Sequence, residues 1–183
     1  WYGWKVNRAG ITRKVSMIKE IRSKKDLAVV LSKLEDFKEH DIKLEQYSTP
    51  SETAAELVWE AAMKGDIKGK VILDAAAGPG FLGLGALLLG AKKVFFVDIS
   101  KKALSIAKRN YESLKEYYLL GEGGFVEKDI KEFEENVDTV VENPPFGTKE
   151  KHADKLFLEK AFEAADVIYT IHKITSKEFI KAL

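Results

Sequence analysis

Residues 70–90, KVILDAAAGPGFLGLGALLLG, contain the transition from an apolar strand to a helix on which the fold is built. KVILDAA is strand-like and runs into the turn AAAGPG, where Gly78 and Gly80 open an apolar helical stretch. Glycine lets the backbone come close to a ligand, and the exposed amides at the start of a helix favour polar or anionic groups. The stretch therefore predicts a strand, a ligand-binding turn and a helix, in that order.

The same alternation of strand and helix continues beyond this stretch. Strand-like segments follow at KKVFFVDIS (92–100), GGFVEKDI (123–130), VDTVVEN (137–143) and DVIYTIHK (166–173), with helices expected at GLGALLLG, KKALSIAKRNYESLKE and EKHADKLFLEKAFEAA and a short acidic turn at 131–135. Two further helices are predicted over 25–37, where apolar residues recur at helical spacing, and from about 52 to 63. Continuous apolar strands alternating with helices indicate an α/β fold with a mostly parallel sheet and helices on both faces.

Composition narrows the chemistry of this domain. The chain has 183 residues, of which 45% are hydrophobic, which is enough for one globular domain with a substantial core. It has no cysteine, which excludes disulfides, thiolate nucleophiles and cysteine-bound zinc, and its three histidines argue against a histidine-rich metal site, so we expect no metal. No apolar run has membrane-spanning length and no cleavable leader is visible, so we expect a cytoplasmic protein without membrane association.

The near-neutral net charge of +1 conceals an asymmetry along the chain. Residues 1–25 carry eight basic side chains and a single acid, Glu20, so the remainder is net acidic. A basic arm can gather a polyanion through its long-range field, although a solvated leader has the same composition. We therefore expect a basic N-terminal extension over 1–24, followed by the folded domain over 25–183.

Polar or special residues follow four successive predicted strands. The strands end at Asp74, Asp98, Asp129 and the segment Asn143–Phe146, NPPF. In an open α/β sheet ligands bind beyond the carboxyl ends of the strands, so these residues are expected to form one site. Asp98 is an acceptor of the kind that binds ribose hydroxyls.

One motif match leads to a different class of enzyme. GPGFLG (78–83) fits G-x-G-x-x-G, and Asp98 lies at about the spacing of the ribose-binding acid of a dinucleotide fold, which would indicate a nicotinamide-dependent oxidoreductase. Asp74 ahead of the glycines, Pro79 within the turn and NPPF after the fourth strand all argue against this alternative.

The NPPF segment is suited to holding a planar amine. The two prolines keep the backbone after the strand extended, which leaves the side-chain oxygen of Asn143 and the carbonyl of Pro144 as acceptors. Together they can accept both hydrogens of an exocyclic amino group such as adenine N6, while Phe146 stacks on the base. A nucleoside held by Asp98 and Asp129, with its tail over the glycine turn, fits S-adenosylmethionine, whose transfer chemistry depends mainly on positioning.

Two further alternatives remain open from the residues. A protein glutamine, as in a release factor, also offers an amide with two N–H groups, and an inactive RNA-binding scaffold subunit would keep the same fold.

The target base itself would be reached most easily in a loop or a single strand, because flipping it out of a helix costs a few kcal/mol.

LEQYSTP (44–50), GDIKGKVILDAAAGPGFLGLGALLLGA (65–91), VVENPPFGTK (140–149) and YTIHK (169–173) together carry a family resemblance. The chain resembles the class I S-adenosylmethionine-dependent methyltransferases, and within them the methyltransferase-like family that methylates adenine N6 of small-subunit ribosomal RNA, including archaeal members. The resemblance covers about residues 17–183. It implies a Rossmann-like sheet, S-adenosylmethionine as cofactor, RNA as substrate and a small zinc-binding activator protein as partner.

The resemblance also implies roles for individual residues. It implies that the cofactor is held by Gln46, Thr49, Ala76, Gly78, Pro79, Phe81, Asp98, Asp129 and Ile130, and the target base by Asn143, Pro144, Pro145 and Phe146. We also expect Asp74, Gly80, Ile99 and Asn143 to contact the cofactor.

Two positions depart from the family pattern. The family has glycine where this chain has Ala76, which puts cofactor affinity in question. Its fold also adds two strands after the fifth, so the domain over 25–183 is expected to be incomplete at its C-terminal end, with a partner or the N-terminal WYGWKV (1–6) covering the edge of the sheet.

Overall fold

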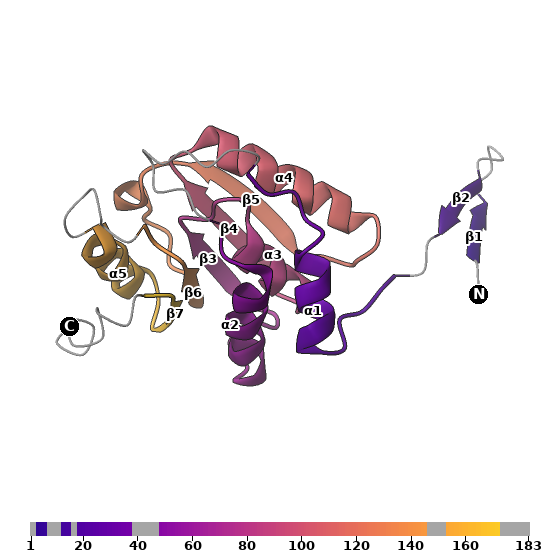
Figure 1. The fold of residues 1–183 in the computed structure, drawn as a ribbon, viewed down its shortest axis with the longest axis horizontal. Helices are drawn as coiled ribbons and strands as arrows, with labels where there is room; N and C mark the ends of the chain where they lie inside the picture. The colour runs from indigo at the N-terminus through magenta and orange to yellow at the C-terminus, as the bar shows by residue number, and fades with distance from the viewer. Residues whose placement is uncertain (1–2, 7–11, 16–17, 38–47, 146–152, 173–183) are drawn as a thin grey trace.

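A five-stranded parallel sheet forms the centre of the molecule (Figure 1). The computed structural model describes residues 3–6, 12–15, 18–37, 48–145 and 153–172. The strands lie in the order β5-β4-β3-β6-β7, and their bounds are β3 Val71–Ala75, β4 Lys93–Asp98, β5 Glu122–Glu127, β6 Thr139–Glu142 and β7 Val167–Thr170. Every neighbouring pair in this sheet is parallel, which confirms the predicted fold class.

Among the described residues, five α-helices and a short 3₁₀ turn connect and cover the strands. Their bounds are α1 Lys24–Leu31, α2 Ser51–Met63, α3 Phe81–Leu88, α4 Lys101–Lys115 and α5 Ala153–Ala164, with the 3₁₀ turn η2 at Ile130–Glu132. Ser23 and Ser100 cap α1 and α4, since each side chain accepts a hydrogen bond from a first-turn amide. The strand and helix segments predicted after residue 50 are thus present in their predicted order.

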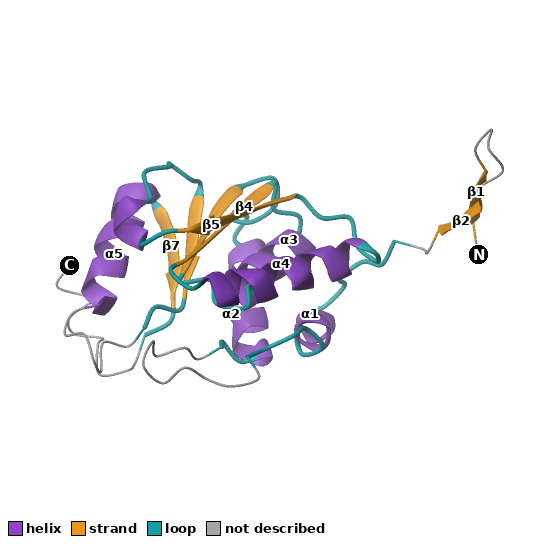
Figure 2. Ribbon diagram, turned by 90° about the horizontal axis from the view of Figure 1, so that it is seen from above, coloured by secondary structure: helices purple, strands orange, loops and turns teal. Residues whose placement is uncertain are grey.

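Alternating side chains of the strands build a core on each face of the sheet. Ile72 and Val141 point into a cluster that includes residues of α1 to α4, whereas Leu73 and Val140 point into a second cluster with α5 and η2. Figure 2 shows α5 on one side of the sheet and the other helices on the opposite side. Because both faces are covered, the strands are apolar on both sides, as their unbroken hydrophobic runs indicated.

The first helix is shorter than the predicted 25–37. The helix α1 ends at Leu31, where the amide of Ser32 still donates to Ala28 O, and the chain then leaves the helical path. Glu35 is held instead by Asn110 of α4, which exchanges hydrogen bonds with both its amide and its carbonyl group. Tertiary hydrogen bonds thus override the helical spacing that placed Phe37 on this helix.

Two short strands precede the domain. The strands β1 Gly3–Val6 and β2 Thr12–Val15 pair with each other in an antiparallel two-stranded sheet (Figure 1). The alternative that WYGWKV adds a strand to the main sheet is wrong for its described residues, because that sheet contains only β3 to β7. The boundary between an extension over 1–24 and a domain over 25–183 stays a prediction. Within the described ranges, no helix is both long and apolar enough to cross a membrane.

Candidate functional site

The parallel register brings the predicted site residues to one edge of the sheet. Ala75 pairs with Val97 on one side and with Glu142 on the other, so the residues that follow these three strand positions emerge together. Asp98 in turn pairs with Glu127 at the end of β5, two residues before Asp129. The turn, the two aspartates and the NPPF segment therefore all begin at the same edge.

The turn after β3 alternates left-handed residues. Ala76, Gly78 and Gly80 have φ values of 57°, 55° and 88°. The turn is closed by a hydrogen bond from Gly80 N to Ala77 O, and it is tied to β4 by one from Ala77 N to Val97 O. Only glycine adopts this conformation without strain, so two of the three positions suit their residues and Ala76 does not.

Replacing Ala76 with glycine is expected to stabilise the protein. Placing an L-residue in the left-handed region costs about 1–2 kcal/mol, which the change to glycine relieves. Glycine also loses more conformational entropy on folding than alanine, so the net gain in the free energy of unfolding is roughly 0.5–1 kcal/mol. Denaturant unfolding measures the difference. Ala77→Gly is the matched control, because Ala77 is buried and has no positive φ, so that variant should be less stable than the parent. Equal losses in both variants would contradict the strain at Ala76.

Two aspartates hold the turn from different sides. Asp98 Oδ2 accepts a hydrogen bond from Gly78 N at 2.8 Å, and its Oδ1 accepts one from Ser100 N at 2.8 Å. Asp74 lies deeper, where its Oδ2 accepts from Gly83 N in the first turn of α3. Asp98 therefore places its carboxylate at the rim of the site, and Asp74 supports the start of the helix beneath it.

Burial raises the pKa of both carboxyl groups. For Asp98 the hydrogen bonds from the Ser100, Gly78 and Ile99 amides partly oppose the effect of desolvation on the pKa. The pKa of Asp74 is raised well above its usual range by desolvation, with the bond from Gly83 acting against it and the nearby charge of Asp98 adding to it.

Asn143 presents an acceptor without a partner. Its Nδ2 donates to Thr49 Oγ1 at 3.0 Å, while its Oδ1 is buried and has no hydrogen-bond partner among the residues that the structure describes. The next residue, Pro144, is buried and has no N–H to donate. Leaving a buried acceptor without a hydrogen bond costs free energy. Its presence at this strand end therefore indicates a site where a donor group of a ligand binds.

Glu142, directly before this segment, is fully buried in the sheet. Its Oε1 accepts a hydrogen bond from Thr170 Oγ1 at 2.9 Å, and its backbone carbonyl accepts from Ile171 N at 3.0 Å. No partner for Oε2 is found within the described part of the chain. Desolvation raises the pKa of Glu142 to about 7, against the lowering effect of the Thr170 bond. These bonds fasten the end of β6 to the end of β7.

Glu142 is expected to make folding stability depend on pH. Its pKa is higher in the folded state than in the unfolded state, so its favourable contribution is full below about pH 4.5 and is lost as the pH rises to about 7. The loss is at most about 3 kcal/mol. Urea unfolding of Glu142→Gln between pH 5 and pH 8 should therefore show a smaller decline than the parent chain. The buried Asp74 and Asp98 contribute in the same direction and are present in both proteins. Parallel curves would show that Glu142 keeps an ordinary pKa.

The remaining predicted site residues lie partly in the core, partly at the surface and partly outside the described residues. Phe81 and Ile130 have buried side chains within the core clusters, so any cofactor contact would come from their backbone groups. Asp129 caps η2 by accepting from Lys131 N, and Ile99 is 59% exposed next to Asp98. Pro79 is buried and Pro145 partly buried, whereas Gln46 and Phe146 lie outside the described residues.

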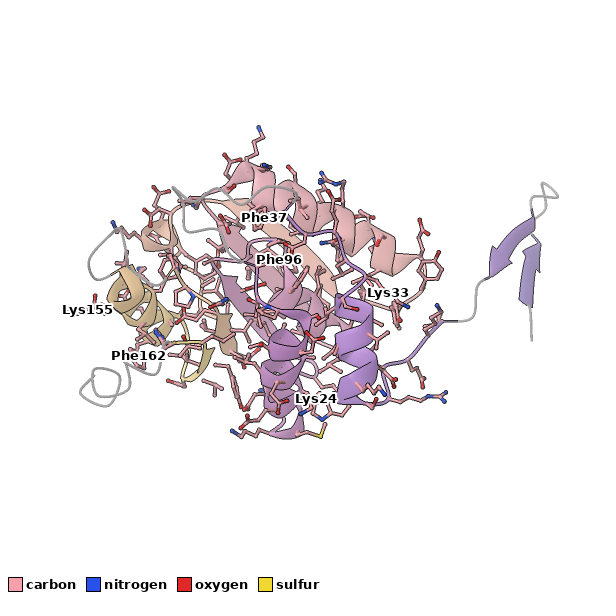
Figure 3. All side chains as sticks on the ribbon, in the orientation of Figure 1. Lys24, Lys33, Phe37, Phe96, Lys155 and Phe162 are labelled. Carbon is pink, nitrogen blue, oxygen red and sulfur yellow. The ribbon has the colours of Figure 1, made fainter. Side chains whose placement is uncertain are left out.

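The sequence analysis missed Asn110 as part of this site. Asn110 is 3% exposed and donates from Nδ2 to Pro79 O at 3.1 Å as well as to Glu35 O at 2.9 Å. It thus ties the glycine turn to the segment after α1, where Phe37 packs on the α4 side (Figure 3). A signal was present, because Asn110 lies on the apolar stripe of α4 with Leu114, where a polar residue needs buried partners.

Known proteins share this fold and sequence. The family described as Conserved hypothetical protein 95 matches residues 52–182. The rRNA N(6)-adenosine-methyltransferase METTL5 of Danio rerio is 32% identical over 164 residues, which are 86% of this chain and 77% of that protein. A Pyrococcus horikoshii protein, provisionally described as an RNA methyltransferase, has a crystal structure that superposes with a TM-score of 0.80 at 47% identity, covering 87% of this chain and 79% of its own.

A more distant structure shares the fold alone. The magnesium protoporphyrin IX methyltransferase of Synechocystis, crystallised with bound S-adenosylmethionine, has a TM-score of 0.57 at 19% identity, over 71% of this chain and 66% of its own.

The parallel sheet, with its glycine turn and polar strand ends, defines a class I S-adenosylmethionine-dependent methyltransferase domain. Within that class, the chain belongs to the Conserved hypothetical protein 95 family, in agreement with the resemblance seen in its sequence.

Proposed function

We propose that this protein transfers the methyl group of S-adenosylmethionine to N6 of an adenine in ribosomal RNA. The observation that carries the proposal is the buried, open acceptor Asn143 Oδ1, at the edge shared with Asp98 and the glycine turn. Relatives named as rRNA N(6)-adenosine-methyltransferases, which match over 73–77% of their own length, support the substrate. The methyltransferase names of these relatives and of the Pyrococcus horikoshii structure favour this function over a nicotinamide-dependent oxidoreductase.

The residues of the turn fit S-adenosylmethionine. Among the described residues, a Cβ at Gly78 would have only Phe37 Cε2 within 4 Å, at 4.0 Å, so this part of the chain leaves space for a ligand against the backbone. The sequence AAAGPG carries no lysine or arginine, which suits a ligand tail without phosphates. Asp98 lies beside this turn with a carboxylate able to accept from ribose hydroxyls, and its negative charge suits a cationic ligand. When bound, the cofactor supplies an electrophilic methyl group on its sulfonium.

The chain's own residues orient the acceptor amine. Asn143 Oδ1 and the Pro144 carbonyl accept the two N6 hydrogens, which directs the nitrogen lone pair out of the ring plane. In the transfer step the bond from N6 to the methyl carbon forms as the carbon–sulfur bond breaks, the sulfonium becomes a neutral thioether, and N6 then releases one proton to solvent. This step requires alignment and open acceptors, and no metal.

A partner is part of the same proposal. The described residues contain no group of three or more metal-binding side chains. In this proposal the zinc belongs to the activator protein. Leu119 is 81% exposed and Tyr117 45% exposed, which offers apolar surface of the kind that such a protein covers. We also propose that the protein is located in the cytoplasm, with ribosomal RNA as its substrate.

A transfer assay tests the substrate. The full chain, alone and with its co-purifying partners, is incubated with tritiated S-adenosylmethionine and either unmodified ribosomal RNA or a release factor, and the labelled product is digested and identified. We expect N6-methyladenosine from the RNA. Label on glutamine of the release factor would support the protein substrate instead, and no transfer with intact cofactor binding would support an inactive scaffold.

A further inference from the structure

The hydroxyl group of Thr49 lies against the amide that the proposed reaction uses. We propose that Thr49 is a positioning residue for Asn143, whose Nδ2 end it holds so that the Oδ1 end stays available to the target amine. The inference rests on the proposed function for the identity of the target. It differs from the family-based expectation for Thr49, which was contact with the cofactor.

Thr49 is itself held in place by its neighbours. It is 8% exposed and directly precedes Pro50, whose carbonyl accepts from Ala54 N at the start of α2. Proline disfavours a helical backbone at the residue before it, which restricts the conformations open to Thr49. On the other side, Ser48 Oγ donates to Asp36 Oδ2 at 2.6 Å. The residue that contacts Asn143 is thus fixed at both ends.

Asn143 needs such a contact because its two amide ends are chemically opposite. Pro144 restricts the backbone of Asn143 but leaves its side-chain torsions free. An amide turned by half a revolution would direct Nδ2, a donor, at the donors of the target amine. With N6 bonded to Oδ1, only an acceptor near the other end satisfies Nδ2, and Thr49 Oγ1 lies there at 3.0 Å. Removing the hydroxyl leaves a buried donor unpaired in the reactive arrangement.

Thr49→Val and Thr49→Ser separate this role from packing. Valine keeps the shape of threonine without the hydroxyl, whereas serine keeps the hydroxyl. We expect kcat to fall about 10- to 100-fold in Thr49→Val, with the Kd for S-adenosylmethionine unchanged by calorimetry, and to recover most of its value in Thr49→Ser. Ser51→Ala is the matched control, because it removes a neighbouring hydroxyl that bonds Glu52 and does not touch Asn143, and it should keep its kcat.

Nuclear magnetic resonance reads the same contact without any substrate. The side-chain amide signals of Asn143, assigned by their absence in Asn143→Ala, should shift in Thr49→Val and stay in place in Thr49→Ser. If the valine variant fails to fold, hydrogen exchange of the parent chain suffices: the Asn143 Nδ2 protons should exchange more slowly than those of the exposed Asn136.

Several outcomes would overturn the inference. A parallel loss of cofactor affinity and kcat in Thr49→Val would assign Thr49 to the cofactor, and full activity in that variant would remove its role altogether. Unshifted Asn143 signals, or exchange as fast as that of Asn136, would show that the hydrogen bond is absent. Failure of the parent chain to methylate adenine would instead refute the proposed function, while the amide signals would still report on Thr49.

Discussion

Asn143→Ala is expected to lower kcat for methyl transfer about 100- to 1,000-fold, the usual effect of removing one group that holds the reacting centre. The variant loses the only side-chain acceptor that we assign to the target amine, Oδ1, which is buried and open in the structure. Affinity for S-adenosylmethionine should be nearly unchanged, because Asp98 and the glycine turn remain. Single-turnover rates with labelled cofactor and calorimetry measure the two quantities separately.

Asn136→Ala is the control for this experiment, since Asn136 is exposed and lies on the same connection before β6. It should match the parent chain in both rate and affinity. If Asn143→Ala lost cofactor affinity to the same degree as rate, Asn143 would be a cofactor-binding residue rather than the holder of the target. A normal rate would remove the basis of the proposed function.

Gly83→Ala is expected to lower the free energy of unfolding by about 3 kcal/mol or more, at the upper end for an overpacked core. The added Cβ would lie 2.5 Å from Phe96 Cε1 and 2.8 Å from both Asp74 Oδ2 and Val94 Cγ1. The first and last of these belong to β4, and Asp74 bonds the amide of Gly83 itself. Relief of the overlap would move α3 away from the sheet and with it the glycine turn, so cofactor affinity should fall too.

Gly85→Ala, two residues further along α3, is the matched control. Its added Cβ would meet Leu31 Cδ1 and Val58 at 3.7 Å, which is ordinary contact, and alanine favours the helix over glycine by about 0.5–1 kcal/mol. The control should therefore be as stable as the parent or more stable. Urea unfolding of the three proteins measures both effects. Similar losses in the two variants would mean that α3 does not approach β4 as closely as described.

Much of the fold could be predicted because its signals are local. The unbroken apolar strands, the glycines at 78 and 80 and the helical periods between them each follow from a few neighbouring residues. The order of the elements and the sidedness of the sheet follow from these signals, since parallel strands need connections over their faces. The end of α1 at Leu31 could not be predicted in this way, because Asn110, 75 positions after Glu35, supplies the bonds that replace the helix.

The candidate site could likewise be predicted only in part from the sequence. Asp98 and Asn143 could be selected from the sequence, because strand ends of a parallel sheet meet at one edge whatever the loops do. The sequence could not predict which atoms of these side chains remain without a hydrogen bond, because their partners lie far along the chain. Thr49 satisfies Nδ2 of Asn143 from 94 positions away, and Gly78 and Ser100 share the carboxylate of Asp98.

The sequence by itself thus determined the class of the protein, its parallel sheet and the edge where its chemistry lies, since period, turn residues and strand ends are written in consecutive positions. Tertiary structure alone decided that Ala76 adopts a left-handed conformation, that Glu142 is buried with a raised pKa, and that Asn143 keeps one open acceptor. The physical reason is that strain, desolvation and hydrogen-bond satisfaction depend on what surrounds a residue in space, and the residues responsible are distant in sequence.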